Sequence, residues 1–147
     1  MDTSLLWASQ ANTVATAFWV VFRIMRDERA KAAVLGELDS IVSETGTDIF
    51  DKHALRRMVY LDSTIDEVFR VAASPLIPRR AQEELVLDLA SGKLHVEKGE
   101  TLCLYPRAMQ MDPEIFDSPE EFRFDRFLAK DGSPARFEKR GQKLAFP

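Results

Sequence analysis

The longest hydrophobic pattern lies at the start of the chain. Residues 5–25 contain no glycine or proline, and apolar side chains occupy nearly every face of the helix that they predict. A helix that is apolar all round has to be buried on all sides. About 21 residues make a helix about 30 Å long, close to the width of a compact body of this chain length. The remaining residues could hardly surround it, so we expect a larger partner to cover it.

Two more helical patterns follow. Asp27 is a candidate N-cap, and residues 30–42 have the spacing of an amphipathic helix, which Gly46 is expected to end. A longer pattern runs from Asp51 or Lys52 to about residue 73, with a candidate break near Asp62. Two prolines then exclude further helix.

The middle of the chain changes to short runs typical of strands. Residues 85–89, 94–96 and 101–105 are strand candidates, separated by two Gly-containing turns. These three strands predict a small β hairpin or meander.

Proline positions predict two short helical turns near the end. Asp112 and Ser118 each precede a proline, as N-caps often do, and Ser118 with Glu121 fits a capping box. Residues 136–143 show no periodicity and are expected to form an exposed loop. We therefore expect residues 1–147 to form one mixed, mainly α unit with a small β hairpin or meander.

Composition narrows the possible functions. The 147 residues are 46% apolar and 30% charged with a net charge of −4, which disfavours a nucleic-acid-binding surface. A single cysteine, Cys103, excludes an intramolecular disulfide. The first apolar helix contains amides at Gln10 and Asn12, which favour a buried helix over a membrane span. His53 and His95 are isolated, so we predict no metal site from side chains of this chain.

Candidate chemistry begins with charged residues that could form a network. Glu67 and Arg70 are three positions apart and share a helix face, as do Asp66 and Arg70 at four apart. Arg126 lies among phenylalanines that would hold a guanidinium against a packed surface. Because the donors of arginine form a fixed fork, two arginines can bind one carboxylate. Glu67, Arg70 and Arg126 therefore suit a buried structural network.

The order of these motifs resembles the C-terminal half of the cytochrome P-450 family, the heme-thiolate monooxygenases. Glu67-Val68-Phe69-Arg70 matches the Glu-x-x-Arg of the family's K helix, and Arg126 in Phe122–Phe127 matches its aromatic-Arg-aromatic segment, with Asp112-Pro113-Glu114 between them. The resemblance covers almost the whole chain. It implies a partial cytochrome P-450 fold comprising helices I, J and K, part of the β1 sheet and the start of the meander.

The first helix resembles the distal I helix of one branch, which contains the sterol 7α-hydroxylases, sterol 12α-hydroxylase and prostacyclin synthase. In this comparison Ala11 and Asn12 replace the usual acid-alcohol pair, and Thr13 follows one residue later. These three residues are the catalytic candidates. Since an amide is a poor proton donor, a relay would run through water, Thr13 or substrate. Alternatively, these are polar residues satisfied by neighbouring carbonyls.

The resemblance also implies binding residues. Trp7 and Ala8 on the first helix, and Pro75, Leu76 and Ile77 after the Glu-x-x-Arg helix, would line a substrate cavity, although an ordinary helix-to-strand connection explains the second group equally well. Arg79, or its neighbour Arg80, would pair with a heme propionate.

By the same resemblance, the parent protein would bind heme b, take electrons from NADPH-cytochrome reductase and hydroxylate a sterol or related lipid. It would lie at the endoplasmic reticulum membrane, anchored through a segment not present here. The family's cysteine ligand comes after the aromatic-Arg-aromatic segment, whereas Cys103 precedes it and is expected to be a small core residue. We therefore expect this chain alone to be inactive.

Two alternatives remain open at this stage. Asn12 is shared with prostacyclin synthase-like enzymes, so the parent could be a heme-dependent lipid endoperoxide isomerase that needs no external electrons. The chain could also be a truncated, non-catalytic product, such as a partial gene model or a splice form.

Overall fold

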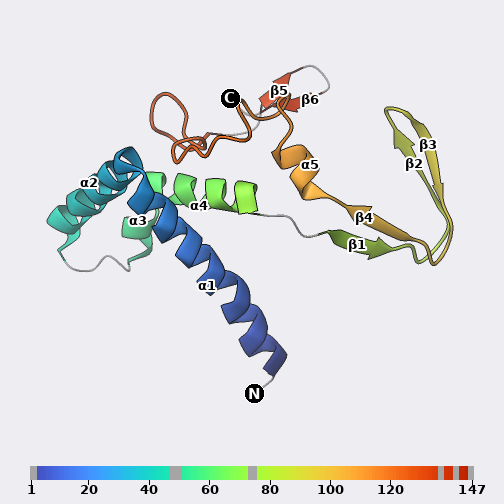
Figure 1. The fold of residues 1–147 in the computed structure, drawn as a ribbon, viewed down its shortest axis with the longest axis horizontal. Helices are drawn as coiled ribbons and strands as arrows, with labels where there is room; N and C mark the ends of the chain where they lie inside the picture. Colours follow the sequence, from blue (N-terminus) through green and yellow to red (C-terminus); the bar gives the residue numbers. More distant parts are fainter. Residues whose placement is uncertain (1–2, 47–50, 73–75, 136–137, 141–142, 146–147) are drawn as a thin grey trace.

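The structure is a computed structural model that describes residues 3–46, 51–72, 76–135, 138–140 and 143–145. Its helices are α1 (Thr3–Arg26), α2 (Glu28–Thr45), α3 (Lys52–Leu55), α4 (Val59–Ala72) and α5 (Pro106–Gln110). Its strands are β1 (Ile77–Arg80), β2 (Leu85–Leu89), β3 (Gly92–Val96), β4 (Thr101–Leu104), β5 (Glu138–Arg140) and β6 (Lys143–Ala145). A mainly α fold with small antiparallel strand pairs is therefore confirmed (Figure 1).

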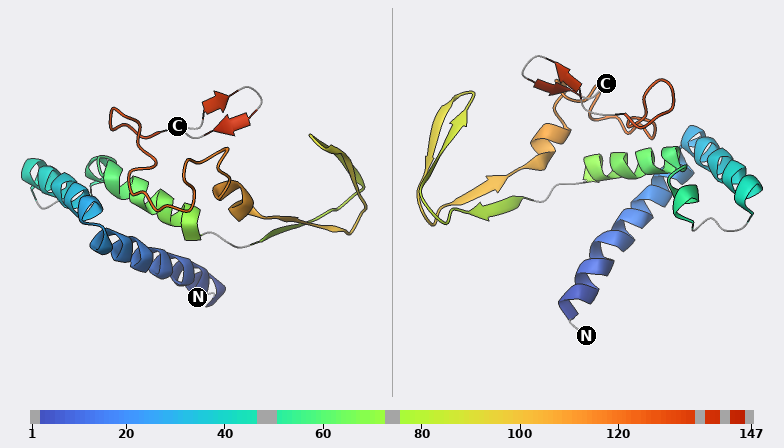
Figure 2. Two further views of the ribbon diagram at one scale, coloured as in Figure 1. Left: turned by 45° about the horizontal axis from the view of Figure 1, so that its top comes forward. Right: turned by 180° about the vertical axis from the view of Figure 1, so that it is seen from behind.

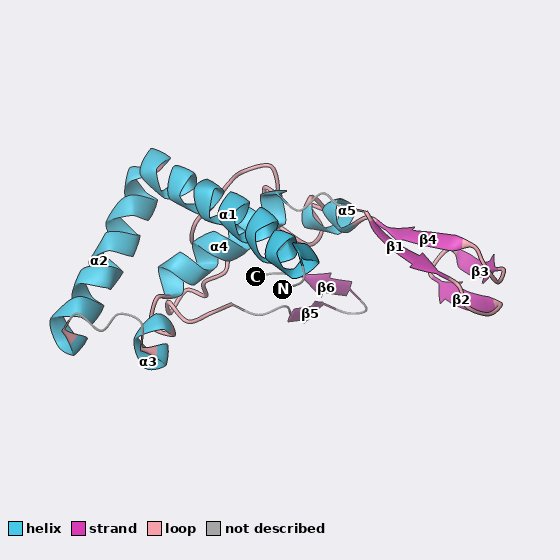
Figure 3. Ribbon diagram, turned by 90° about the horizontal axis from the view of Figure 1, so that it is seen from below, coloured by secondary structure: helices cyan, strands magenta, loops and turns pink. Residues whose placement is uncertain are grey.

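Helix α4 occupies the centre of the arrangement. It contacts α1, α2 and α5, and the segment after α5 passes along it (Figures 1 and 2). Strands β1 to β4 extend beyond the C-terminal end of α4 as an arm, on the opposite side from α2 (Figure 3). The small core formed by Ile41, Ala54 and Met58 lies between α2, α3 and the start of α4.

The boundaries of α2 follow the local sequence signals. The Asp27 side chain accepts hydrogen bonds from the backbone N–H groups of Arg29 at 2.9 Å and Ala30 at 3.2 Å. Gly46 follows the helix with φ of 72°, a backbone conformation that glycine adopts without steric cost. The predictions for Asp27 and Gly46 are therefore confirmed.

The break in the next helical pattern was predicted at the wrong place. Helix α3 ends at Leu55 and α4 begins at Val59, so the interruption precedes Asp62. Met58, in the interruption, is buried against Ile41 and Ala54. Burying Met58 against α2 fixes the direction in which the chain enters α4.

A residue of α2 caps the start of α4. The Glu37 carboxylate accepts hydrogen bonds from the backbone N–H groups of Tyr60 at 3.0 Å and Leu61 at 3.3 Å. The first amides of a helix lack partners within the helix, and a negative charge is favoured near them. Glu37 therefore supplies across a tertiary contact what an N-cap side chain would supply locally.

The strands pair differently from a simple meander. β2 and β3 form the predicted antiparallel hairpin, but β4 pairs with β1, placing Cys103 opposite Pro78. β1 was not predicted as a strand because Pro78 interrupts the pattern, and proline is tolerated in an edge strand. The expected loop over residues 136–143 is also wrong in part, since β5 and β6 form a hairpin there.

The two predicted helical turns form only as turns. The backbone N–H of Phe116 donates to the Asp112 carbonyl at 2.9 Å, and that of Glu121 donates to the Ser118 carbonyl at 3.0 Å. Ser118 has φ of 45°, whereas an N-cap residue is extended, so the predicted capping box is wrong. The backbone carbonyls of Asp117 and Ser118 accept hydrogen bonds from Arg126.

Much of the apolar surface of α1 is exposed in the described structure. Val20 is buried, but Trp7, Val14 and Phe18 are 75%, 65% and 61% exposed. The helix was predicted correctly, but the described residues do not bury α1 on all sides. Within the described residues, no helix combines the length and hydropathy needed to cross a membrane.

The capping contact predicts a specific loss of stability. Glu37→Ala removes the acceptor for two amides of α4, and we expect the free energy of unfolding to fall by about 1–2 kcal/mol. Asp39→Ala, an exposed position on the same helix, is the control and is expected to change it by less than about 0.5 kcal/mol. Urea unfolding followed by circular dichroism measures both, and equal losses would contradict the capping role.

Candidate functional site

The centre of the site is a carboxylate on α4. Glu67 is fully buried, and the helical repeat places Ser63 and Arg70 on the same face of α4. Arg70 donates to Glu67 from Nε to Oε2 at 2.7 Å and from Nη2 to Oε1 at 2.8 Å. This is a two-point contact between guanidinium and carboxylate, the geometry that binds most strongly.

Arg126 reaches the same carboxylate from a distant part of the chain. Its Nε lies 3.0 Å from each oxygen of Glu67. The backbone N–H of Arg123 donates to Oε1 of Glu67, also at 3.0 Å. The structure therefore brings together Glu67, Arg70 and Arg126, which we call the Glu67 network.

Backbone carbonyls satisfy the remaining donors of the two arginines. Arg70 donates to the Gln110 carbonyl at 2.7 Å and to the Glu121 carbonyl at 3.3 Å. Arg126 donates to the carbonyl of Glu121 at 2.7 Å and also to those of Asp117 and Ser118. Both arginines are almost fully buried, and among the described residues no buried side-chain polar atom lacks a partner. Such completeness is required because an unpaired buried charge is very costly.

The Glu67 network joins α4 to the end of α5 and to the segment from Asp117 to Arg126. Sequence analysis missed two of its supports: the Arg123 amide, and Ser63, whose hydroxyl accepts from the Phe127 N–H at 3.1 Å. Ser63 precedes Glu67 by four positions, so the helical period carried a signal for it. A backbone amide has no signal in the sequence.

The surroundings of two other carboxylates of α4, Asp62 and Asp66, disfavour their charged forms. Partial desolvation raises the pKa of Asp62 above its ordinary value. Desolvation also raises the pKa of Asp66, and the negative charge of Asp62, four positions away, adds to the rise. The carboxylate that accepts hydrogen bonds from Arg70 is that of Glu67.

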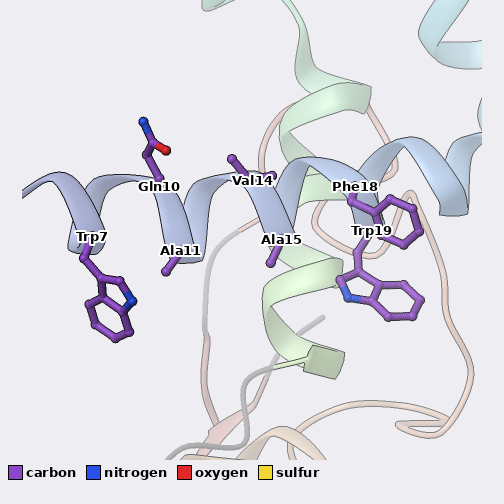
Figure 4. A pocket seen from close by; sticks show the side chains of 7 residues that line it. All are labelled: Trp7, Gln10, Ala11, Val14, Ala15, Phe18 and Trp19. Atoms are coloured by element: carbon purple, nitrogen blue, oxygen red, sulfur yellow. The ribbon is translucent and has the colours of Figure 1, made fainter.

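A second feature of the site is an open cavity along α1, with a volume of about 770 Å³. Figure 4 shows side chains projecting from this face of α1; its lining residues are Trp7, Gln10, Ala11, Val14, Ala15, Phe18 and Trp19. The lining is mainly apolar and includes no ionisable group. A face of this kind can accept a flat apolar molecule.

The catalytic candidates lie at different positions around α1. Ala11 lines the cavity, whereas Asn12 and Thr13 are exposed and are not among its lining residues. Because successive helical residues are rotated by about 100°, Asn12 lies about 100° and Thr13 about 200° from Ala11 around the axis of α1. Of the three catalytic candidates, the structure therefore places only Ala11 among the lining residues of the cavity.

Leu76, Ile77 and Arg79 are not among the residues that line this cavity. Ala8 lies in α1, Leu76 is exposed, Ile77 is half-buried in β1, and Pro75 lies outside the described residues. Arg79, in β1, donates from Nη1 to the Pro78 carbonyl at 2.9 Å and is exposed. Since every lining residue comes from α1, the structure does not join Leu76, Ile77 or Arg79 to the cavity.

Cys103 is exposed on β4, so the prediction of a core residue is wrong. The two-stranded sheet of β1 and β4 has no covering layer in the described structure, which leaves the side chains of β4 largely accessible (Figure 1). Among the described residues, no group of three or more His, Cys, Asp or Glu side chains could hold a metal ion.

Comparisons with known proteins agree with these motifs. The family model described as Cytochrome P450 matches residues 3–146. Cytochrome P450 7B1 of Mus musculus is 40% identical over 146 residues, covering 95% of this chain and 29% of that protein. Prostacyclin synthase of Homo sapiens is 36% identical over 147 residues, again covering 95% of this chain and 29% of that protein.

A solved structure shares the fold. The zebra fish cytochrome P450 structure with abiraterone has a TM-score of 0.64 and 26% identity, covering 80% of this chain and 28% of that chain. The chain thus spans less than a third of the length of these two relatives and of this structure.

The Glu67 network predicts that breaking its buried ion pairs lowers the free energy of unfolding much more than breaking an exposed pair. Glu67→Gln leaves two buried guanidiniums without a countercharge, and we expect a loss of about 3–5 kcal/mol in the free energy of unfolding. Arg123→Gln removes only the exposed pair with Asp117 and is expected to cost less than about 1 kcal/mol. Urea unfolding of both variants is the measurement, and a loss for Glu67→Gln as small as that for Arg123→Gln would contradict the energetic role.

The raised pKa of Asp66 predicts that replacing its carboxylate increases stability in a pH-dependent way. The folded state holds its proton to higher pH than the unfolded chain, so ionisation lowers stability above about pH 4. We expect Asp66→Asn to raise stability at pH 7 by a few tenths of a kcal/mol, with the gain vanishing below about pH 4. Asp131→Ala should instead lower stability at pH 7, because hydrogen bonds from Ser133 lower the pKa of Asp131 and so favour its charged form in the folded state. Thermal unfolding at several pH values distinguishes the two.

Proposed function

The chain belongs to the cytochrome P450 family, and we propose that it supplies the distal helix and the structural network of a heme-dependent monooxygenase that acts on lipids. The observation that carries the proposal is the buried Glu67, bound by Arg70 and Arg126 from two distant segments of a chain that matches the family over residues 3–146. In this proposal α1 is the distal helix I, α2 is helix J and α4 is helix K.

The proposed substrate is a sterol or a related flat lipid. Two relatives are named for sterol oxidation: 25-hydroxycholesterol 7-alpha-hydroxylase of Rattus norvegicus and Cholesterol 7-alpha-monooxygenase of Cricetulus griseus. The apolar, uncharged face of α1 is suited to such a molecule. Trp7 and Ala8 would contact it from α1, with Pro75, Leu76 and Ile77 contributing from the connection after α4.

In this proposal α1 and Arg79 would contact different parts of heme b, and the iron ligand would not come from the described residues. The α1 face offers apolar contact to a flat macrocycle, and Arg79 is an exposed cation available to a propionate. Cys103 lies on β4 in the strand arm, ahead of the Arg126 segment, and does not fit the family's axial ligand position. When bound through a thiolate, the heme activates oxygen. We propose that the chain by itself has no monooxygenase activity.

The chain's own residues would position water and substrate. The amide of Asn12, exposed on α1 next to Ala11 in the sequence, can donate to or accept from an ordered water but is a poor acid. Ala11 contributes no polar group and leaves room beside it. Any proton relay would therefore run through water, Thr13 or the substrate.

The partners and location are proposed from the family as a whole. NADPH-cytochrome reductase would supply electrons, and the endoplasmic reticulum membrane would be the site. The second candidate is a heme-dependent lipid endoperoxide isomerase, favoured by Asn12 and by the 36% identity to Prostacyclin synthase.

A chimera tests whether the chain can supply these elements. Its residues would replace the matching 146 residues of mouse Cytochrome P450 7B1. We expect the chimera to bind heme with the ferrous-carbonyl absorbance of a thiolate ligand, and the Glu67→Gln chimera to lose it. The 147-residue chain mixed with heme b should not give that spectrum. Failure of the unmutated chimera to bind heme would overturn the proposal.

Product analysis of the same chimera separates the candidate reactions. A hydroxylated sterol that forms only with reductase and oxygen supports a monooxygenase, whereas conversion of a lipid endoperoxide without electrons supports an isomerase. Asn12→Ala should lower turnover by about tenfold or more. Ser40→Ala, at an exposed position of α2, is the control and should leave turnover unchanged.

A further inference from the structure

A small polar cleft lies where α1 meets the segment before Arg126. Its volume is about 340 Å³, and it is lined by Phe22, Arg23, Arg26, Asp27 and Phe122. This size admits an ion or a small polar group but not a sterol. The cleft shares no lining residue with the apolar cavity of α1, so neither the Glu67 network nor the proposed heme and substrate positions account for it.

Two guanidiniums in the cleft are held by aromatic rings. The guanidinium carbon of Arg23 lies 4.7 Å from the centre of the Phe122 ring, and that of Arg26 lies 5.4 Å from the centre of the Phe22 ring. A guanidinium over a ring face keeps its N–H groups at its edges, where they remain available to an acceptor. The ion pairs among the described residues include Arg29, Arg57, Arg70, Arg123 and Arg126, but not Arg23 or Arg26.

Asp27, the carboxylate that lines the cleft, uses one of its oxygens to cap α2. Oδ1 of Asp27 accepts the backbone N–H groups of Arg29 and Ala30 at the start of α2. That position is favourable for a carboxylate because it faces the positive end of a helix. The ion pairs among the described residues do not include Asp27. Two arginines and one aspartate line the cleft, which gives it a net positive charge within a chain of net charge −4.

We propose that this cleft binds a phosphate group, as free phosphate or as a phosphate monoester. Each guanidinium offers a fork of donors that matches two oxygens. A carboxylate has two oxygens and is satisfied by one fork, whereas a phosphate has enough oxygens and charge for both. The simpler alternative is that Arg23 and Arg26 only favour the negative end of α1, in which case no anion binds.

Isothermal titration of the full 147-residue chain with inorganic phosphate, at constant ionic strength set with chloride, tests the site. We expect saturable binding that falls by about tenfold or more in Arg23→Gln and in Arg26→Gln. Arg23→Lys keeps the charge but loses the fork, and should bind with intermediate affinity. Arg56→Gln, an exposed arginine outside the cleft, is the control and should bind as the parent does.

Further arms identify the chemistry and the source of the phosphate. Acetate should bind at least about tenfold more weakly than phosphate, since one fork satisfies it. A vesicle assay distinguishes a lipid headgroup from free phosphate. If vesicles containing phosphatidic acid bind the chain, neutral vesicles do not, and Arg23→Gln abolishes the binding, the phosphate belongs to a lipid headgroup. Circular dichroism of each variant verifies folding. Absence of saturable phosphate binding, or an equal loss in Arg56→Gln, would overturn the proposal.

Discussion

The arrangement of this chain depends on one buried carboxylate. Glu67 has no exposed surface and accepts hydrogen bonds from Arg70, Arg126 and the Arg123 amide. A buried charge of this kind is tolerated only when its partners are complete, because each missing partner leaves a desolvated ion. The segments that supply those partners are therefore held in one arrangement, in which the chain after α5 lies along α4.

Helix α4 is held at three levels by groups outside its own sequence. Glu37 of α2 caps its first turn, the Glu67 network fixes its middle, and Arg107 of α5 donates to the Val71 carbonyl in its last turn at 3.1 Å. Satisfying helix ends through tertiary contacts makes the position of α4 depend on its neighbours. Helix α1 differs, because its contacts with α2 and α4 leave most of its apolar face exposed.

Scaffold and chemistry occupy separate parts of the chain. The Glu67 network is built from described contacts and agrees with the family match over residues 3–146. The proposed oxygen and lipid chemistry lies on α1, where Ala11 lines the cavity and Asn12 is the exposed residue that follows it. The chain spans 29% of the length of the mouse relative.

The sequence by itself determined the features that depend on local physics. Hydrophobic periodicity located the long helices, Asp27 and Gly46 marked the ends of α2, and the turn at Ser91-Gly92 predicted the β2–β3 hairpin. The grouping of Glu67, Arg70 and Arg126 also came from the sequence, through the order of motifs in a known family, because a contact across 59 positions has no local signal.

Tertiary structure decided what depends on distant groups. The break before Val59 follows from burial of Met58 and capping by Glu37, and β4 pairs with β1 across the intervening hairpin. The conformation of Ser118 accompanies the binding of Arg126 to the carbonyls beside it, which displaced the locally expected cap. In each case long-range contacts outweighed a local preference, since propensities differ by only about 1 kcal/mol while a buried, desolvated charge costs several.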